Sequence, residues 1–336
     1  MTSGTAVRVV LRRTAQVVVT VVLLGFLGWS VAGRWDEVRG VLGDLSAGGL
    51  VLAGLAATVA YGCGFLSWRV LLTDLGAPVP VTGAARIFFV GQLAKYLPGK
   101  VWPILFQARL GRAYQVPGRT SAAAGLLALL VTLGTGLLVT VGLLPALGDR
   151  AFDRFWWTVL VLPAALVALW PPLLNRLFAR LLRLARREPL PRPLTGRGIG
   201  PAVGWSVAGW LAYGVHLWLL LRDAGATGAT LPLVAVGAFA GSWCLGFLLA
   251  VAPAGVGARE VAVPLLLAGS VAAPVALVAA VVSRLLMTVV DLLCPLCAVL
   301  TERVRSGHPV GGPAGRPGPP AEKAPSAGRT PVLPDC

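Results

Sequence analysis

Two lysines flank a break in an otherwise apolar stretch of the sequence. Lys95 and Lys100 lie on either side of Pro98-Gly99, within Lys95-Tyr96-Leu97-Pro98-Gly99-Lys100-Val101-Trp102. Pro and Gly interrupt helices, and the backbone N–H groups freed by such a break can bind a phosphate beside the lysine ammonium groups. The stretch therefore predicts an anion-binding site with Lys95, Tyr96, Pro98, Gly99, Lys100 and Trp102 as candidate residues.

A second set of charged residues follows another break, later in the chain. The stretch Ala252-Pro253-Ala254-Gly255-Val256-Gly257-Ala258-Arg259-Glu260 ends in two adjacent opposite charges. Arg284 lies near the middle of the last apolar run, and Asp291 follows seven residues later on roughly the same helical face. A charge facing lipid costs about 2.5–3.5 kcal/mol, whereas one facing a polar cavity can bind an anionic head group. Gly255, Gly257, Arg259, Glu260, Arg284 and Asp291 therefore join the candidate binding residues.

Each of these charges also has a purely structural explanation. Lys95 and Lys100 can extend to the membrane surface if their segment lies at a shallow depth. Arg259 and Glu260 can neutralise each other, and Arg284 can bond backbone carbonyls at a helix break. The sequence leaves these alternatives open.

The sequence contains no recognisable motif for catalysis, metal binding or nucleotide binding. His216 and His308 are the only histidines, and no His, Cys and carboxylate residues have metal-ligand spacing. Cys294-Pro295-Leu296-Cys297 lies in a predicted membrane helix, where no redox or metal role is expected. Gly99-Lys100 lacks the other residues of a P-loop. The sequence thus predicts no catalytic residue, no metal, no cofactor and no enzymatic activity.

The composition is that of a membrane protein. Hydrophobic residues make up 57% of the 336 positions and charged residues 12%, with a mean hydropathy of +0.81; soluble domains carry about 25% charged residues. The net charge of +16 does not indicate nucleic acid, because the basic residues cluster at the ends of apolar runs, where they set topology and contact anionic lipid. The excess of Arg over Lys, with abundant Ala, Gly, Val and Leu, is typical of a GC-rich bacterial genome. We therefore expect a multi-pass plasma-membrane protein whose partners are lipids with anionic head groups.

The apolar runs predict an all-α polytopic membrane protein with about six full spans. The basic flanks place the N- and C-termini in the cytoplasm. Residues 1–305 form the predicted transmembrane domain, and the Pro- and Gly-rich residues 306–336 a disordered tail. The strongly basic loop 175–200 is expected to begin as an amphipathic helix on anionic lipid. The expected spans are 15–33, 47–68, 121–147, 155–174, 201–221 and 275–300.

Two broken segments predict re-entrant hairpins. Residues 84–97 and 100–112 are each too short to span a bilayer and are flanked by basic residues, so they should enter from the cytoplasm. Residues 231–252 and 261–269 should form a second hairpin that enters from outside. Residues 231–252 are long enough to span, which would place the tail outside, but the distribution of basic residues favours the hairpin. The hairpins occupy matching places in an inverted repeat by topology, although no repeat is evident at the level of residues.

Both breaks resemble a known family. Gln92-x-x-Lys95-Tyr96-Leu97-Pro98-Gly99-Lys100-Val101-Trp102, followed by Arg109, is similar to a signature of the flippase-like membrane region of lysylphosphatidylglycerol synthases. The second break resembles that family's Pro-Gly-Gly-Leu-Gly-x-Arg-Glu motif, with Ala254 in place of the usual Gly. The resemblance covers about residues 10–303 and adds Arg109 to the candidate binding residues. It implies a stand-alone member without the soluble aminoacyl-transferase domain.

The implied activity is movement of a lipid head group between leaflets. An aminoacylated phosphatidylglycerol, another phospholipid and a polyprenyl-linked sugar all remain open as substrates. Two alternatives belong to other classes. One is a non-transporting scaffold for a lipid-modifying or cell-wall enzyme, and the other is an integral-membrane transferase that uses Lys95, Arg259 and Glu260.

Overall fold

The computed structural model describes residues 35–97, 101–143, 167, 170–184, 186, 188–248 and 258–306. Every regular element among them is helical, and five of these helices are long and apolar enough to cross a membrane. The expected all-α polytopic membrane fold is therefore confirmed. The tail after residue 306, the span 15–33 and most of the span 155–174 lie outside the described residues. The five long helices are α3 (Ala47–Asp74), α6 (Gly118–Gly142), α10 (Gly196–Asp223), α11 (Leu231–Leu248) and α13 (Ala273–Ser306).

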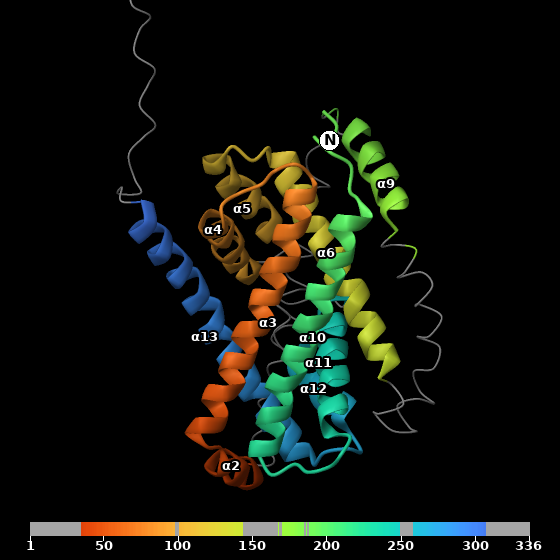
Figure 1. Ribbon diagram of the computed structural model, residues 1–336. Helices are drawn as coiled ribbons and strands as arrows, with labels where there is room; N and C mark the ends of the chain where they lie inside the picture. Colours follow the sequence, from red (N-terminus) through yellow and green to blue (C-terminus); the bar gives the residue numbers. More distant parts are fainter. Residues whose placement is uncertain are drawn as a thin grey trace, which may run out of the picture.

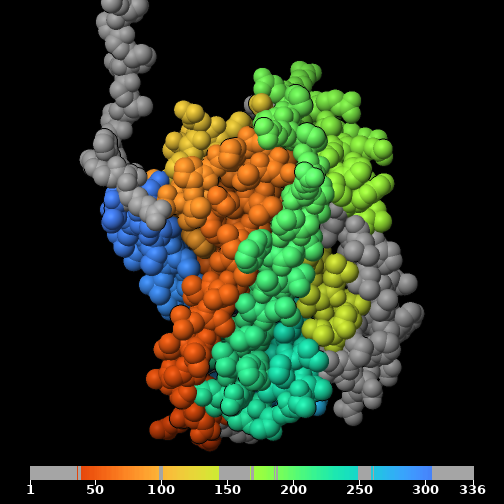
Figure 2. All heavy atoms as spheres, viewed as in Figure 1, coloured from red at the N-terminus to blue at the C-terminus, as the bar shows by residue number. Residues whose placement is uncertain are grey.

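Helices α3 and α10 form the central antiparallel pair, and they lie side by side along the molecule (Figures 1 and 2). Each helix is capped by the other. Asp223, at the end of α10, accepts hydrogen bonds from the backbone N and Oγ of Ser46, the N-cap of α3, both at 2.8 Å. Asp74, at the end of α3, accepts the same two bonds from Thr195, the N-cap of α10, at 2.8 and 2.7 Å. The exchange of caps fixes the register of the pair at both ends.

Equivalent residues of α3 and α10 make equivalent contacts, so the inverted repeat holds at the level of residues. The sequence alone did not reveal this. Both helices have 28 residues, and both end in the same glycine turn, with φ of 88° at Gly76 and 85° at Gly225. Only glycine adopts this backbone conformation without steric cost. Ser67 donates to the Ala202 carbonyl at 2.9 Å, and His216 Nδ1 donates to the Ala53 carbonyl at 2.8 Å. The sequence interval from Ser67 to His216 equals that from Ala53 to Ala202, so these two bonds are equivalent.

The segments on either side of the first break form a hairpin, as expected. Hairpin 1 consists of α4 (Val81–Gln92), the 3₁₀ turn η1 (Leu93–Tyr96) and α5 (Trp102–Gly111). Gly91 of α4 packs on Gln107 of α5, so the two arms run antiparallel. The hairpin follows α3 and precedes η2 (Arg112–Tyr114) and α6, and both of its ends lie at the same end of the molecule. We call this the α9 end, because α9 (Pro171–Leu184) also lies there (Figure 1).

The helices on either side of the second break also form a hairpin, and it enters from the opposite end. Hairpin 2 consists of α11 and α12 (Ala258–Leu267), which pack antiparallel, with Gly246 against Arg259 and Gly241 against Leu266. The hairpin starts beside the end of α10 and returns to the start of α13, which contacts the region of α2 (Trp35–Asp44). We call this the α2 end. The best 18-residue window of α11 is 67% buried, against 33–44% for the other long helices. Helix α11 is thus an enclosed hairpin arm rather than a lipid-facing span.

Helix α9 comprises the first part of the basic loop, which was expected to form an amphipathic helix. Leu174 and Phe178 are buried in the core, while Leu177 and Leu181 are exposed. The side chain of Asn175 holds the helix in place, because its amide exchanges two hydrogen bonds with the backbone of Leu194, at 2.8 and 2.9 Å. Since Leu194 precedes the cap of α10, α9 is fixed to the central helix pair. The exposed arginines of this helix are Arg176, Arg180 and Arg183.

Candidate functional site

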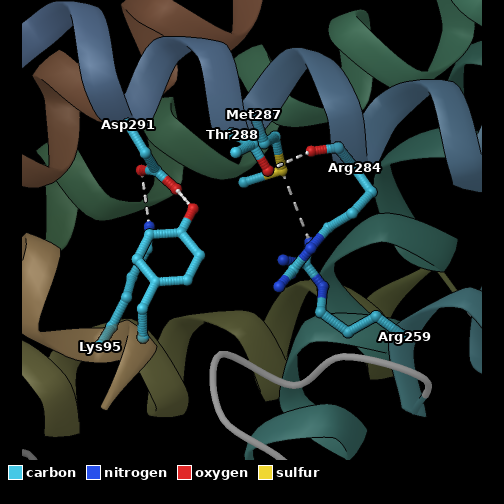
Figure 3. A network of polar contacts seen from close by, with 7 residues as sticks. Lys95, Arg259, Arg284, Met287, Thr288 and Asp291 are labelled. Atoms are coloured by element: carbon cyan, nitrogen blue, oxygen red, sulfur yellow. Dashed lines mark hydrogen bonds and ion pairs between the residues drawn. The ribbon is translucent and has the colours of Figure 1, made fainter.

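One face of α13 carries the polar residues on which the two hairpins converge. Arg284, Thr288 and Asp291 follow each other at helical spacing, one turn apart. Asp291 is 5% exposed, and the hydroxyl of Thr288 donates to the Arg284 carbonyl at 2.9 Å, so it stays within the helix. The face thus presents one cation and one buried carboxylate within an apolar helix (Figure 3).

Hairpin 1 contributes Lys95 and Tyr96 from the 3₁₀ turn at its tip. Lys95 Nζ lies 2.6 Å from Asp291 Oδ1 and forms an ion pair with it (Figure 3). The hydroxyl of Tyr96 donates to the other carboxylate oxygen at 2.7 Å. The ammonium group also lies 5.4 Å from the ring centre of Tyr61, within reach of a cation–π contact. The 3₁₀ turn, which ends the helix before the Pro-Gly break, therefore aims both polar groups at α13.

Hairpin 2 contributes Arg259 from the first turn of α12. Its guanidinium lies 5.0 Å from the ring centre of Phe239, and Nη2 lies 3.9 Å from Sδ of Met287. A Cβ at Gly246 would lie 2.7 Å from Cγ of Arg259, so a larger residue there would displace the arginine side chain where it crosses α11. Figure 3 shows the side chains of Arg259 and Arg284 pointing toward one another. Two guanidinium groups from separate elements therefore meet beside the Lys95–Asp291 pair.

The cluster carries an excess of positive charge. Among the described side chains it holds three cations, Lys95, Arg259 and Arg284, against one carboxylate. Lys95 pairs with Asp291, and the guanidinium groups of Arg259 and Arg284 lie beside this pair. Guanidinium groups bind phosphate through two parallel hydrogen bonds, which suits the site to a lipid phosphate.

The structure does not bring the other predicted residues to this cluster, or it does not describe them. Trp102 is the first residue of α5 and is 38% exposed. Arg109 is exposed in the last turn of α5, two turns from the hairpin tip. Glu260 belongs to α12, but its side chain is outside the description. The remaining predicted residues, Pro98, Gly99, Lys100, Gly255 and Gly257, lie outside the described residues.

Several residues of the cluster were not found from the sequence. Tyr61 and Phe239 supply aromatic faces to Lys95 and Arg259, and aromatic residues in membrane helices are too common to single these two out. Thr288 could have been identified from the sequence, because it lies between Arg284 and Asp291 on the same helical face. His216 is fully buried, and its Nε2 lies 2.8 Å from Oγ of Ser283. Because the Ala53 carbonyl can only accept, His216 Nδ1 donates and Nε2 accepts from the serine hydroxyl.

One of the comparisons with known proteins identifies a family. Residues 9–294 match the model of a family described as the lysylphosphatidylglycerol synthase TM region. The match includes both hairpins and the part of α13 that carries Arg284 and Asp291. A comparison with curated proteins finds no match.

Proposed function

Because this chain belongs to the family of the lysylphosphatidylglycerol synthase transmembrane region, a membrane family tied to lipid modification or translocation, we propose that it moves an anionic or aminoacylated lipid between leaflets. The observation that carries the proposal is the convergence of the hairpins. They enter from opposite ends, and each delivers a cation, Lys95 or Arg259, to the same face of α13. In transporters built from inverted repeats, the substrate binds where such broken helices meet.

The geometry supports transfer of the head group without a chemical step. A phosphate that leaves water loses its hydration and needs replacement partners of opposite charge. In this proposal Arg259 and Arg284 bind the phosphate directly, while Lys95 exchanges Asp291 for the head group. The acyl chains remain in lipid, against the exposed apolar side chains of the outer helices. A phospholipid and a polyprenyl-linked lipid both fit this proposal, since both present a phosphate.

The test is leaflet exchange in liposomes that contain only this protein. Fluorescent phosphatidylglycerol, aminoacyl-phosphatidylglycerol, phosphatidylcholine and a polyprenyl phosphate are each incorporated, and dithionite added outside destroys the outer-leaflet signal. The proposal expects exchange to be faster than in protein-free liposomes for at least one anionic or aminoacylated lipid. Exchange of none of them would contradict the proposal and favour the scaffold function. Equal exchange of all four would indicate an unspecific lipid pathway.

The orientation follows from the same proposal. The α9 end carries Arg112, Arg119 and the arginines of α9, so by the positive-inside rule it should face the cytoplasm. In a cysteine-free background, Asp44→Cys should react with a membrane-impermeant maleimide in intact cells. Arg183→Cys should react only after permeabilisation. The reverse pattern would contradict this orientation of the two hairpins.

A further inference from the structure

Helix α11 supports the side chain of Arg259 over two of its turns. The stem of Arg259 crosses Gly246, and its guanidinium carbon lies 5.0 Å from the ring centre of Phe239. Phe239 precedes Gly246 by seven residues, so both lie on one face of α11. The Nη2 atom lies 3.9 Å from Sδ of Met287 on α13. The side chain therefore runs along α11 to Phe239 and meets α13 there.

Two side chains of α10 hold the ring of Phe239. The ring of Tyr213 is stacked on it, with centroids 4.7 Å apart and an angle of 11° between the planes. The ring of His216 meets it edge-on, at 6.0 Å and 87°. Phe239 is 1% exposed. Stacked and edge-to-face contacts each favour one orientation of a ring, so the orientation of the ring in contact with Arg259 is fixed.

The two helices that carry these rings approach each other closely. A Cβ at Gly214, next to Tyr213, would lie 2.7 Å from Cα of Val236 in α11. Because the obstruction is backbone, the helices come this close only with glycine at position 214. Val236 lies one turn before Phe239, so the close approach is beside the ring pair. Helix α10 is thus a firm base for the ring.

His216 connects this ring to the part of α13 that carries Arg284. Its Nδ1 donates to the Ala53 carbonyl of α3, and its Nε2 accepts from the hydroxyl of Ser283, both at 2.8 Å. Ser283 immediately precedes Arg284. The same imidazole thus touches Phe239 and fixes α13 one residue before Arg284. Helix α10 is therefore a common reference for the two arginines of the cluster.

An aromatic ring differs from a carboxylate as a support for a cation. It attracts a guanidinium through its quadrupole but carries no charge, so the contact with Phe239 does not neutralise Arg259. Lys95, by contrast, is held by the carboxylate of Asp291. The ring fixes the place of Arg259 and does not compete with an anion for its charge.

We infer that Phe239 is a positioning residue, which holds the guanidinium of Arg259 beside Arg284 for the phosphate of a lipid head group. Tyr213 and His216 fix the ring, and the ring fixes the arginine. This role rests on the proposed function, because that function assigns a phosphate to Arg259. The contact between ring and guanidinium can be measured without any lipid.

Binding of a short-chain phospholipid tests this role. The full chain in detergent is titrated with dihexanoyl-phosphatidylglycerol, and the shift in melting temperature gives an apparent Kd. Phe239→Leu should raise this Kd at least about fivefold, because leucine is apolar but offers no ring face to the guanidinium. Phe239→Tyr keeps the ring face and should bind within about twofold of the wild type. Wild-type affinity in a folded Phe239→Leu protein would overturn the role.

The effect should also depend on Arg259, because the ring acts through that residue. In an Arg259→Gln background, Phe239→Leu should change the Kd by less than about twofold. An equal loss of affinity in both backgrounds would mean that the ring acts on the site without the arginine, and it would overturn the inference.

The matched control is Phe88→Leu in α4 of hairpin 1. Phe88 is also buried, at 4% exposure, and its ring contacts the rings of Tyr61, Phe65 and Trp68. This substitution should lower the melting temperature as Phe239→Leu does, but it should leave the Kd within about twofold. A rise in Kd equal to that of Phe239→Leu would show that loss of any buried ring disturbs the site, and the specific role of Phe239 would fall.

Stability measurements separate the contact from the proposed function. Phe239→Leu, Arg259→Gln and the double variant are unfolded by SDS in mixed micelles. If the ring and the guanidinium interact, the unfolding constant of the double variant should be at least about threefold lower than the product of the two single effects predicts. Independent effects would overturn the contact and the role with it. A coupling of this size in a protein that neither binds nor exchanges lipid would contradict only the proposed function.

Discussion

Replacing Arg259 or Arg284 by Gln should reduce leaflet exchange at least about tenfold while the protein remains folded. Each guanidinium can give a phosphate two charge-assisted hydrogen bonds, and bonds to charged groups contribute about 1.5–3 kcal/mol each. Since about 1.4 kcal/mol corresponds to a factor of ten, loss of one such partner is sufficient for this effect. Gln keeps much of the length of the side chain but neither its charge nor its fork of donors. The measurement is the rate of leaflet exchange in liposomes, with melting temperature and elution profile as checks of folding.

The matched control is the same substitution on α9. Arg176 and Arg180 are exposed and distant from the hairpin tips, so Arg176→Gln, Arg180→Gln should leave exchange within about twofold. The lysine of the cluster provides a graded comparison. Because Lys95 acts as a point charge already shared with Asp291, Lys95→Gln should weaken exchange less than either arginine change. Loss of exchange in the α9 variant, with exchange intact in Arg259→Gln and Arg284→Gln, would refute the head-group site and favour the scaffold function.

Removing only one of the two charges of the Lys95–Asp291 pair should destabilise the protein more than any other single substitution in the cluster. Asp291→Leu leaves an ammonium without its carboxylate, and Lys95→Met leaves a carboxylate that is only 7% exposed without its cation. The double variant removes both charges and should recover part of the lost stability. We expect a coupling of about 1–2 kcal/mol, toward the middle of the usual range because the lysine side chain is 28% exposed. Unfolding of the four proteins in mixed micelles with increasing SDS measures it.

Leaflet exchange separates this structural coupling from function. The double variant should be more stable than Asp291→Leu and still be slow in exchange, because the ammonium proposed to bind the head group is gone. Wild-type exchange in the double variant would mean that the pair only holds hairpin 1 against α13. Additive losses of stability would mean that the two side chains do not interact in the membrane.

The broken segments were predictable because their signals are local. Membrane insertion acts on each apolar run separately, so run length, the Pro98-Gly99 break and flanking arginines suffice to propose spans and hairpins. The same reasoning predicted that Arg284 and Asp291 share a face, since their spacing belongs to one helix. It also located a charge on each hairpin, at Lys95 and Arg259.

Which of these charges meet was decided by the tertiary structure. Lys95 and Asp291 are 196 positions apart. Nothing in the sequence around Lys95 favours Asp291 over Glu260 as its partner, and nothing around Asp291 favours Lys95 over Arg284. The contacts of Arg86 in α4 and Tyr114 in η2 with Glu302 in α13 join three elements and were not predicted. The reciprocal caps of α3 and α10 show the same limit. Ser46 and Asp74 are ordinary helix-end residues until the antiparallel pairing brings each to its partner on α10.

The physical reason lies in the two kinds of free energy involved. Transfer of an apolar segment from water to lipid depends on that segment alone, and the sequence therefore determined the spans, the breaks and the family signatures. Association of helices within lipid gains no such transfer energy and depends on close packing and on hydrogen bonds between particular side chains. Those terms depend on distances between residues far apart in the chain. Only the folded structure could therefore decide that two hairpins from opposite ends bring Lys95 and Arg259 to one face of α13.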